Sequence, residues 1–338
     1  MAALTDAGTL VRLAYQGLVI LGVDADEVLK RSGLEPEKLY TSNLRTQFSA
    51  QPKFWQAAVE LSGDPCIGLH IGEHMPAYRG QIVEYLFLSS ISFGDGLRRN
   101  IRYQRLLSDA LQAQIIEGST PYLTGYFNNN QYVTSHLSEA FTLGVIKGFK
   151  AFTDEAFKPK KVIFRHSPNT DIAEYERIFD CEVEFNAKEF RLYFEKEILD
   201  YRSLNSAPEL LNLHVKVAED HMARLQQQDL IGDVNSLIAS MLESGTASLE
   251  TVAAKLKITP RQLRHQLKSA DTSFQHLLNN LRHSLARRML SKTDEDISEI
   301  VYLTGFSEPS TFYRAFKRWE NTTPVEYRQR FRSTTTTA

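Results

Sequence analysis

Two segments near the C-terminus each have the pattern of a helix, a tight turn and a second helix. The first covers residues 248–268 and the second covers residues 296–319. In the first segment Thr259 comes directly before Pro260, which predicts an N-cap followed by proline at the first helical position, where a missing amide costs nothing. A duplicated unit of this kind restricts the C-terminal part of the chain to an all-α domain with two similar halves.

The second segment carries start and stop signals of its own. Asp296 and Glu299 have the spacing of a capping box that opens a helix, and Gly305 can close that helix in the left-handed conformation. Ser307 is then predicted to cap the last helix, with Glu308 favourable beside the positive end of the helix dipole. Both segments are therefore predicted to be helix-turn-helix units.

The second helix of each unit separates into an apolar and a polar face. Leu263 and Leu267 are predicted to face inward in the first, and an apolar stripe at i, i+3, i+4 and i+7 is predicted in the second, formed by Phe312, Ala315, Phe316 and Trp319. The opposite faces carry side chains suited to DNA: Arg261, Arg264, His265 and Lys268 in the first helix, and Ser310, Thr311, Arg314 and Arg318 in the second. Arginine can bind guanine through two hydrogen bonds in the major groove, and serine or threonine can contact bases or phosphates.

The alternative for one such helix is an ordinary solvated basic face, but two of them, each after its own capped turn, favour double-stranded DNA as the partner. Residues 273–292 are predicted to form one helix, roughly 25–30 Å long, which could hold the two units about one DNA turn apart. Residues 240–332 contain 15 Lys and Arg against 10 Asp and Glu, so the overall charge of −2 conceals a basic C-terminal part on an acidic remainder. That asymmetry is expected when only one part meets phosphate.

The C-terminal residues resemble the AraC/XylS family of bacterial transcription regulators over roughly residues 235–332. The stretches that carry this resemblance are 286–290, 305–310, 312–319 and 323–328. The resemblance implies that Arg261, Arg264 and His265 face bases in one recognition helix, and that Pro309, Ser310, Thr311 and Arg314 do so in the other. It also implies transcription activation through contact with RNA polymerase at promoter DNA. Val301 departs from the family, which usually has alanine there.

Residues from about 20 to 205 resemble a second domain of that family, an arabinose-binding-like sensing domain. The matching stretches are 29–34, 62–69, 105–109 and 162–166. This resemblance implies a small-molecule effector and a homodimer.

The N-terminal region has mixed helical and strand patterns, and the fold class is predicted to be α+β followed by an all-α domain. Helices are predicted over 7–21, 52–62, 81–90, 95–111 and 137–156, and strands over 112–117, 121–127, 161–166, 181–186 and 190–195. The predicted domains are 1–205 for the effector, 206–232 as a linker helix, 233–332 for DNA and 333–338 as a disordered tail.

Pro208 is predicted to open the linker helix, which would run to about Gln228 and be followed by a flexible join within 226–232. Its apolar positions follow a heptad spacing, formed by Leu211, Val215, Ala218, Met222 and Leu225. This stripe is predicted to be a dimer seam. The alternative is that it packs on its own N-terminal domain.

Aromatic residues with nearby arginines could line an effector pocket with apolar walls and a charged anchor. The chosen residues are Arg79, Tyr85, Arg102 and Tyr103. The effector expected from this combination is an amphipathic carboxylate, such as a fatty acid or an amino-acid metabolite. The alternative is that the aromatic residues belong to the ordinary core.

His70, Glu73 and His74 match the His-x-x-Glu-His arrangement of certain zinc peptidases. Because Gly72 and Pro76 predict that the required helix ends here, neither a metal site nor another cofactor is expected, and the protein is predicted not to be an enzyme. Two alternatives stay open: an enzyme within residues 1–205 with a regulatory DNA-binding tail, and a DNA binder without a ligand. Bound zinc or a turnover lost on His70→Ala would favour the enzyme.

Cys66 and Cys181 are too few and too separated for a disulfide framework. The sequence has no run of about 20 apolar residues and no signal-peptide pattern at its start, so no membrane association is expected. A cytoplasmic, nucleoid-associated protein is predicted.

Overall fold

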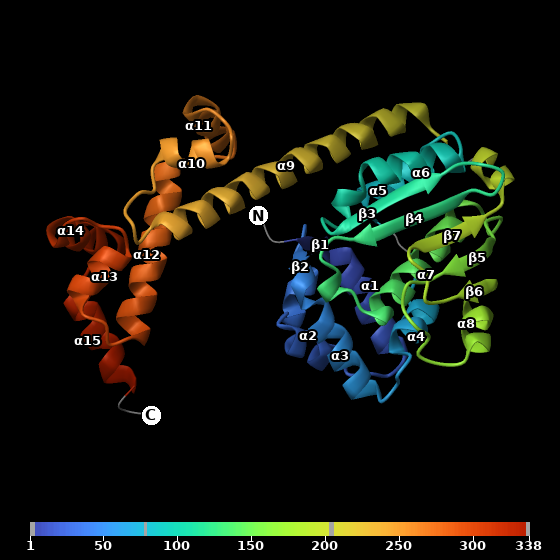
Figure 1. Cartoon of the computed structure of the whole chain (residues 1–338), viewed down its shortest axis with the longest axis horizontal. Helices are drawn as coiled ribbons and strands as arrows, with labels where there is room; N and C mark the ends of the chain where they lie inside the picture. The colour runs from blue at the N-terminus through green and yellow to red at the C-terminus, as the bar shows by residue number, and fades with distance from the viewer. Residues whose placement is uncertain (1–3, 78–79, 203–205, 336–338) are drawn as a thin grey trace. The chain divides into compact units, whose positions relative to one another are not determined.

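The computed structural model describes residues 4–77, 80–202 and 206–335. The chain folds as two compact units, one within residues 3–222 and one from residue 223 onward (Figure 1). The first unit mixes helices with strands, and the second consists of helices, so the predicted α+β class followed by an all-α domain is confirmed.

A five-stranded sheet organises the first unit, with the strand order β3-β4-β7-β5-β6. The neighbours pair antiparallel except β5 and β6, which are parallel. The sheet strands are β3 (Leu111–Ile116), β4 (Tyr122–Phe127), β5 (Pro159–Ile163), β6 (Glu182–Glu184) and β7 (Phe190–Phe194). Two further short strands, β1 (Thr5–Ala7) and β2 (Arg45–Gln47), form a separate antiparallel pair.

Some helices of this unit pack against the sheet, and others form a helical layer beside it. They are α1 (Gly8–Ile20), α2 (Ala25–Ser32), α3 (Gln51–Ser62), α4 (Ile67–His74), α5 (Ile82–Leu88), α6 (Phe93–Arg102), α7 (Ser135–Phe152) and α8 (Ile172–Phe179). Single 3₁₀ turns occur at Pro36–Tyr40, Phe48–Ala50, Gln104–Leu106, Asn130–Tyr132 and Lys196–Asp200.

Helices α4 and α7 cross closely because glycine lies at the contact. A Cβ atom at Gly68 would stand 2.3 Å from the Cα atom of His136, and one at Gly72 would stand 2.4 Å from a methyl carbon of Leu143. Lys147 on α7 also donates to the carbonyl oxygens of Glu73 and Met75 at the end of α4. This crossing fixes α7 as the central helix of the unit.

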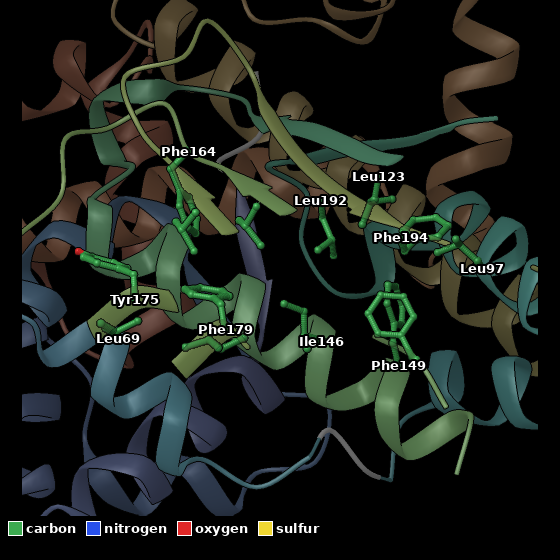
Figure 2. Packing of buried hydrophobic residues seen from close by; sticks show 14 of the residues in the cluster. Leu69, Leu97, Leu123, Ile146, Phe149, Phe164, Tyr175, Phe179, Leu192 and Phe194 are labelled. Atoms are coloured by element: carbon green, nitrogen blue, oxygen red, sulfur yellow. The ribbon is translucent and has the colours of Figure 1, made fainter. Parts of the chain in front are cut away.

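Two apolar cores lie on either side of this central helix. One joins α7 to the sheet, where Phe149 and Ile146 meet Leu192 and Phe194 (Figure 2). The other joins α1 to α4 and the start of α7, with Trp55 and Leu137 among its members. The helical layer and the sheet therefore share α7.

The long helix α9 (Pro208–Met241) contributes to both units. Its first part belongs to a cluster with α5 and with Tyr103, the residue after α6, and its second part supplies Val234 and Ile238 to the core of the second unit. The predicted flexible join within 226–232 is wrong, because the helix continues through it. A single Gly232 costs only about 1 kcal/mol relative to alanine and does not by itself stop a helix.

The second unit repeats a short helix and a longer one on either side of α12 (Phe274–Lys292). The first pair is α10 (Leu249–Lys255) and α11 (Pro260–Ser269), and the second pair is α13 (Ile297–Leu303) and α14 (Pro309–Glu320), followed by α15 (Pro324–Thr335). Leu277 and Leu278 of α12 belong to the core of the first pair, whereas Ala286 and Leu290 belong to the core of the second. One helix thus serves two separate small cores.

Several sequence predictions need correction. Helix α14 has Glu308 at its N-cap instead of Ser307, because Pro309 occupies the first helical position; Asp296 caps α13 without a side-chain hydrogen bond, so no capping box forms there. The predicted helix over 95–111 ends at Arg102, and the helices α2 and α8 were not predicted. The predicted disordered tail begins too early, since α15 includes residues 333–335; residues 336–338 lie outside the described residues.

Within the described ranges, no helix is long and apolar enough to cross a bilayer.

Candidate nucleic-acid interface and ligand cavity

The helix α11 presents a basic face to solvent. Thr259 caps it in a reciprocal arrangement with Gln262: the Gln262 backbone amide donates to the Thr259 hydroxyl (3.2 Å), and the Thr259 amide donates to the Gln262 side chain (2.8 Å). Leu263 and Leu267 are fully buried against the core of their unit. The predicted DNA-contacting side chains Arg261, Arg264, His265 and Lys268 are all exposed.

The helix α14 has the same division of faces. Phe312, Ala315 and Phe316 are buried, and Trp319 packs at the edge of their cluster. Its predicted DNA-contacting side chains Ser310, Thr311, Arg314 and Arg318 are exposed. The Arg314 Nε atom donates to the carbonyl oxygen of Ser310 at 3.3 Å.

The turn before α14 is held by Arg282 of α12. Gly305 has a φ of +76°, as predicted for the residue that ends α13. The Arg282 side chain donates to the carbonyl oxygens of Thr304 (3.2 Å) and Gly305 (2.5 Å), and burial lowers the pKa of its guanidinium. Val301, the departure from the family pattern, is fully buried in the same core.

A cavity of about 570 Å³ lies in the first unit. Its wall is largely apolar and comes from α1, α3, α6, α7 and the strands β3 and β4; aromatic members are Phe48, Phe54, Trp55, Phe127, Phe141, Phe149 and Phe152. This volume and lining are typical of sites for small organic ligands.

Some charged side chains that line this cavity are free to bind a ligand, whereas others already have partners within the protein. Lys38 and Lys53 line it and are exposed. Arg45 also lines it, but its guanidinium already donates to Thr5 and to Asp109 (3.1 Å). Asp6 accepts hydrogen bonds from Ser108 (2.6 Å) and Gln51 (2.8 Å), and burial raises the pKa of its carboxyl. Lys38 and Lys53 are therefore the cations available to an anion in the cavity.

Of the residues predicted for the effector, the three that the structure describes, Tyr85, Arg102 and Tyr103, are not among those that line this cavity. Tyr103 is buried against α9, and Tyr85 lies against His214 of α9 with ring centres 5.4 Å apart. Arg102 is exposed at the end of α6, and Arg79 lies outside the described residues. The sequence shows that aromatic residues are frequent here but not which of them face α9, so the prediction could not separate Tyr85 and Tyr103, which pack on α9, from the aromatic residues of the cavity.

Most of the predicted dimer seam is occupied within the chain. Leu211 and Ala218 are buried against Val83, Leu86 and Tyr103, and Val215 and Met222 pack on the same cluster. Leu225 is half-buried and lies beyond this cluster. The alternative interpretation, packing on the N-terminal domain, therefore describes the first four positions, because the heptad spacing suits any flat apolar neighbour.

The histidines of the His-x-x-Glu-His pattern lie on one short helix, which was not among the predicted helices and ends at His74, two residues before Pro76. His70 Nδ1 is 2.5 Å from a carboxylate oxygen of Asp64, and His74 Nδ1 is 2.9 Å from the carbonyl oxygen of His70. Each ring thus has a local partner. Among the described residues, no group of three or more His, Cys, Asp or Glu side chains is placed to hold a metal ion.

The first unit has an apolar ligand cavity, and the second has two helix-turn-helix motifs with exposed basic helices. This is the arrangement of an effector-responsive DNA-binding regulator. Comparison with known proteins agrees with this class. Residues 22–203 match the model of the N-terminal arabinose-binding domain of AraC transcription regulators, and residues 252–330 match a helix-turn-helix domain. The chain belongs to the AraC family of transcription regulators.

The relatives match either most of this chain or about a quarter of it. The ornithine utilization regulator of Pseudomonas aeruginosa is 25% identical over 311 residues, 91% of each chain. VirS of Mycobacterium tuberculosis is 27% identical over 80% of this chain and 71% of its own, and the transcriptional activator RhaS of Enterobacter sp. is 39% identical over 24% of this chain and 30% of its own. The crystal structure of CdpR from Pseudomonas aeruginosa covers 89% of this chain and 95% of its own with a TM-score of 0.44 and 18% identity.

The protein is therefore a DNA-binding transcription regulator whose N-terminal domain binds an effector. The sequence already indicated both properties, whereas it did not locate the cavity. No short motif marks that cavity, because its wall comes from segments between Asp6 and Phe152 that only the fold brings together.

Proposed function

We propose that this regulator activates transcription as a homodimer, with α11 and α14 in successive major-groove segments of promoter DNA. The observation that carries the proposal is the pair of exposed faces on these helices. Each of the two helices begins with a proline after its turn, and each has its own core on α12. Arg261, Arg264, His265 and Lys268 would contact DNA from α11, and Ser310, Thr311, Arg314 and Arg318 from α14.

Contact with RNA polymerase beside the promoter would provide the activation. The name of the shorter relative RhaS describes that protein as an activator, which supports this part of the proposal. A fusion of the target promoter to a reporter gene tests it: transcription should rise when the chain is present, and a fall would identify a repressor.

Binding to DNA is tested with genomic fragments selected by the purified full chain, followed by affinity measurements at several salt concentrations. The recovered fragments should share a motif that spans two major-groove segments, and affinity should fall steeply with salt because phosphate contacts release counterions. Binding that is weak and shows no motif, with and without ligand, would contradict the proposal.

The effector would occupy the cavity of the first unit as an amphipathic carboxylate. Its apolar part would contact the aromatic wall, and its carboxylate would meet Lys38 or Lys53 at the exposed edge. One relative along the full chain is named for the utilization of ornithine, an amino acid, and this supports a carboxylate-bearing metabolite.

Thermal unfolding of the full chain with decanoate, decanol and L-ornithine tests the ligand class. A carboxylate effector predicts that decanoate or ornithine raises the melting temperature more than decanol does, and that Lys38→Met with Lys53→Met removes the difference. Equal shifts for decanoate and decanol would show that the cavity selects only for apolar character.

A further inference from the structure

A buried group of ionisable side chains lies at the place where α4, α7 and α8 meet. Its centre is Glu139 of α7, which is completely buried. Tyr175 of α8 donates to Glu139 Oε1 at 2.8 Å, and the Asn169 side chain donates to the same oxygen at 3.2 Å. The second carboxyl oxygen, Oε2, is buried without a hydrogen-bond partner.

Two imidazoles flank this carboxyl group. His136 Nδ1 is 3.9 Å from Oε2, and His166 Nδ1 is 3.9 Å from Oε1. His166 Nδ1 lies 2.9 Å from the carbonyl oxygen of Ser167, so this nitrogen carries a proton and donates it there. His136 Nδ1 and His166 Nε2 are both buried without a hydrogen-bond partner, like Glu139 Oε2.

The other groups that face Glu139 come from α4, the loop before it, and α8. They are Asp64, Cys66, His70 and Glu174. His70 interacts with Asp64 at 2.5 Å and with Glu174 at 3.7 Å. Among the described residues, no lysine or arginine forms an ion pair with Glu139.

Burial raises the pKa of Glu139 to about 7, against the lowering effect of the hydrogen bond from Tyr175. Burial also lowers the pKa of both His136 and His166. A neutral carboxylic acid beside two neutral imidazoles is the arrangement that a dry environment favours. Loss of the Glu139 proton would leave a carboxylate with one unpaired oxygen in the interior.

The helix that carries this group also forms a wall of the ligand cavity. Leu137, Ala140, Phe141 and Gly144 of α7 line the cavity, whereas His136 and Glu139 face α4 and α8. The tight crossing at Gly68 places His136 directly against α4.

We propose that Glu139, His136, His166 and Tyr175 form a proton-dependent lock that fastens α7 to α4 and α8 and weakens as Glu139 ionises. The protonated acid stabilises the folded first unit, and this contribution is complete below the pKa of an unfolded glutamate. It is lost as the pH rises through the folded pKa. The two histidines act in the opposite direction, since their buried neutral rings stabilise the fold above the ordinary histidine pKa.

The test compares the full chain with Glu139→Gln, which keeps the shape and both histidines but cannot ionise. Trp319→Phe in both proteins leaves Trp55, one of the two tryptophans of the chain, as the fluorescent reporter of the first unit. Trp55 is buried and lies 6.1 Å from the His136 ring. Urea unfolding is followed at intervals from pH 5 to 8.

The unfolding equilibrium constant of the parent, divided by that of Glu139→Gln, should rise on the order of tenfold per pH unit between pH 5 and 7, then level off. The infrared band of a protonated carboxyl should titrate near pH 7 in the parent and be missing in the variant. A ratio that stays constant from pH 5 to 8, or a band that titrates only in the ordinary range of glutamate, would overturn the proposal.

Tyr175→Phe provides a second variant if Glu139→Gln does not fold. Because the Tyr175 hydroxyl stabilises the carboxylate, its removal should move the midpoint of the infrared titration to higher pH. An unchanged midpoint would contradict the lock. His74→Gln, on the same helix as His70 but away from Glu139, should leave both measurements as in the parent.

Discussion

The guanidinium of Arg282 lies 4.4 Å from the centre of the Phe306 ring. This contact joins α12 to the turn that precedes α14, and the same guanidinium donates to the carbonyl oxygens of Thr304 and Gly305. A cation over an aromatic face is stabilised by the ring quadrupole. The position of the second proposed recognition helix therefore depends on one arginine of α12.

Arg282→Met should destabilise the second helix-turn-helix unit by about 1–3 kcal/mol, because it leaves two partly buried carbonyl oxygens without their donor. Trp319 packs in the same cluster as Phe306, so its fluorescence in a Trp55→Phe chain reports the unfolding of this unit. Arg288→Met, at an exposed position of the same helix, should change stability by less than about 0.5 kcal/mol. Equal effects of the two changes would show that the Arg282 contacts do not stabilise the turn.

Gly305→Ala should destabilise the same unit more than Gly245→Ala does. Both glycines have a positive φ, +76° and +64°, so alanine in the left-handed conformation costs about 1–2 kcal/mol of stability at either position. A Cβ atom at Gly305 would also stand 2.5 Å from the carbonyl oxygen of Leu242, whereas Gly245 has open space. The overcrowding should add about 1–3 kcal/mol at Gly305 alone. Thermal unfolding of both variants would reveal the difference, and similar melting temperatures would refute it.

Arg264→Ala and Arg314→Ala should each weaken binding to a recovered target site by about 1–3 kcal/mol and relax specificity at one base pair. The fluorescence anisotropy of labelled duplexes, with every base pair varied in turn, measures both effects. Lys216→Ala removes one exposed positive charge from α9 outside the proposed interface and should leave affinity and specificity unchanged. If Arg314→Ala binds as tightly as the parent chain, the proposed role of this residue is wrong.

A larger side chain at Gly148 should fill the ligand cavity without disturbing the helix around this residue. The nearest atom to an added Cβ there is a Phe152 ring carbon at 3.7 Å, an ordinary contact distance. Gly148→Ala should stabilise the first unit by about 0.5–1 kcal/mol, because alanine favours a helix interior more than glycine does. Gly148→Leu should project into the cavity and remove the melting-temperature increase caused by decanoate. An undiminished increase in Gly148→Leu would mean that decanoate binds elsewhere.

The DNA-binding half of the molecule could be predicted in detail because its signals are local. Thr259 with Pro260, Gly305, and the four-residue spacing of Phe312 and Phe316 each depend on a few neighbouring residues. The faces of α11 and α14 follow from that spacing alone. The error at Ser307 arose because serine is a common N-cap, whereas Pro309 shifts the helix start by one residue.

The ligand cavity could not be predicted because it depends on contacts between distant segments. Tyr103 and Phe149 are both aromatic residues of helical or near-helical segments, yet Tyr103 is covered by α9 and Phe149 lines the cavity. Periodicity identifies a buried face but not the element that covers it. The stripe from Leu211 to Met222 shows the same limit: its spacing predicted a buried face, and in the structure Val83, Leu86 and Tyr103 cover it.

The shared helix α9 limits how the chain can be divided or recombined. A fragment that stops before Pro208 leaves Val83, Leu86 and Tyr103 without the side chains that cover them, and one that starts at Asp233 lacks Leu230 and Ile231. Exchange of either half with a related protein would therefore need a crossover inside the helix, between Met222 and Leu230.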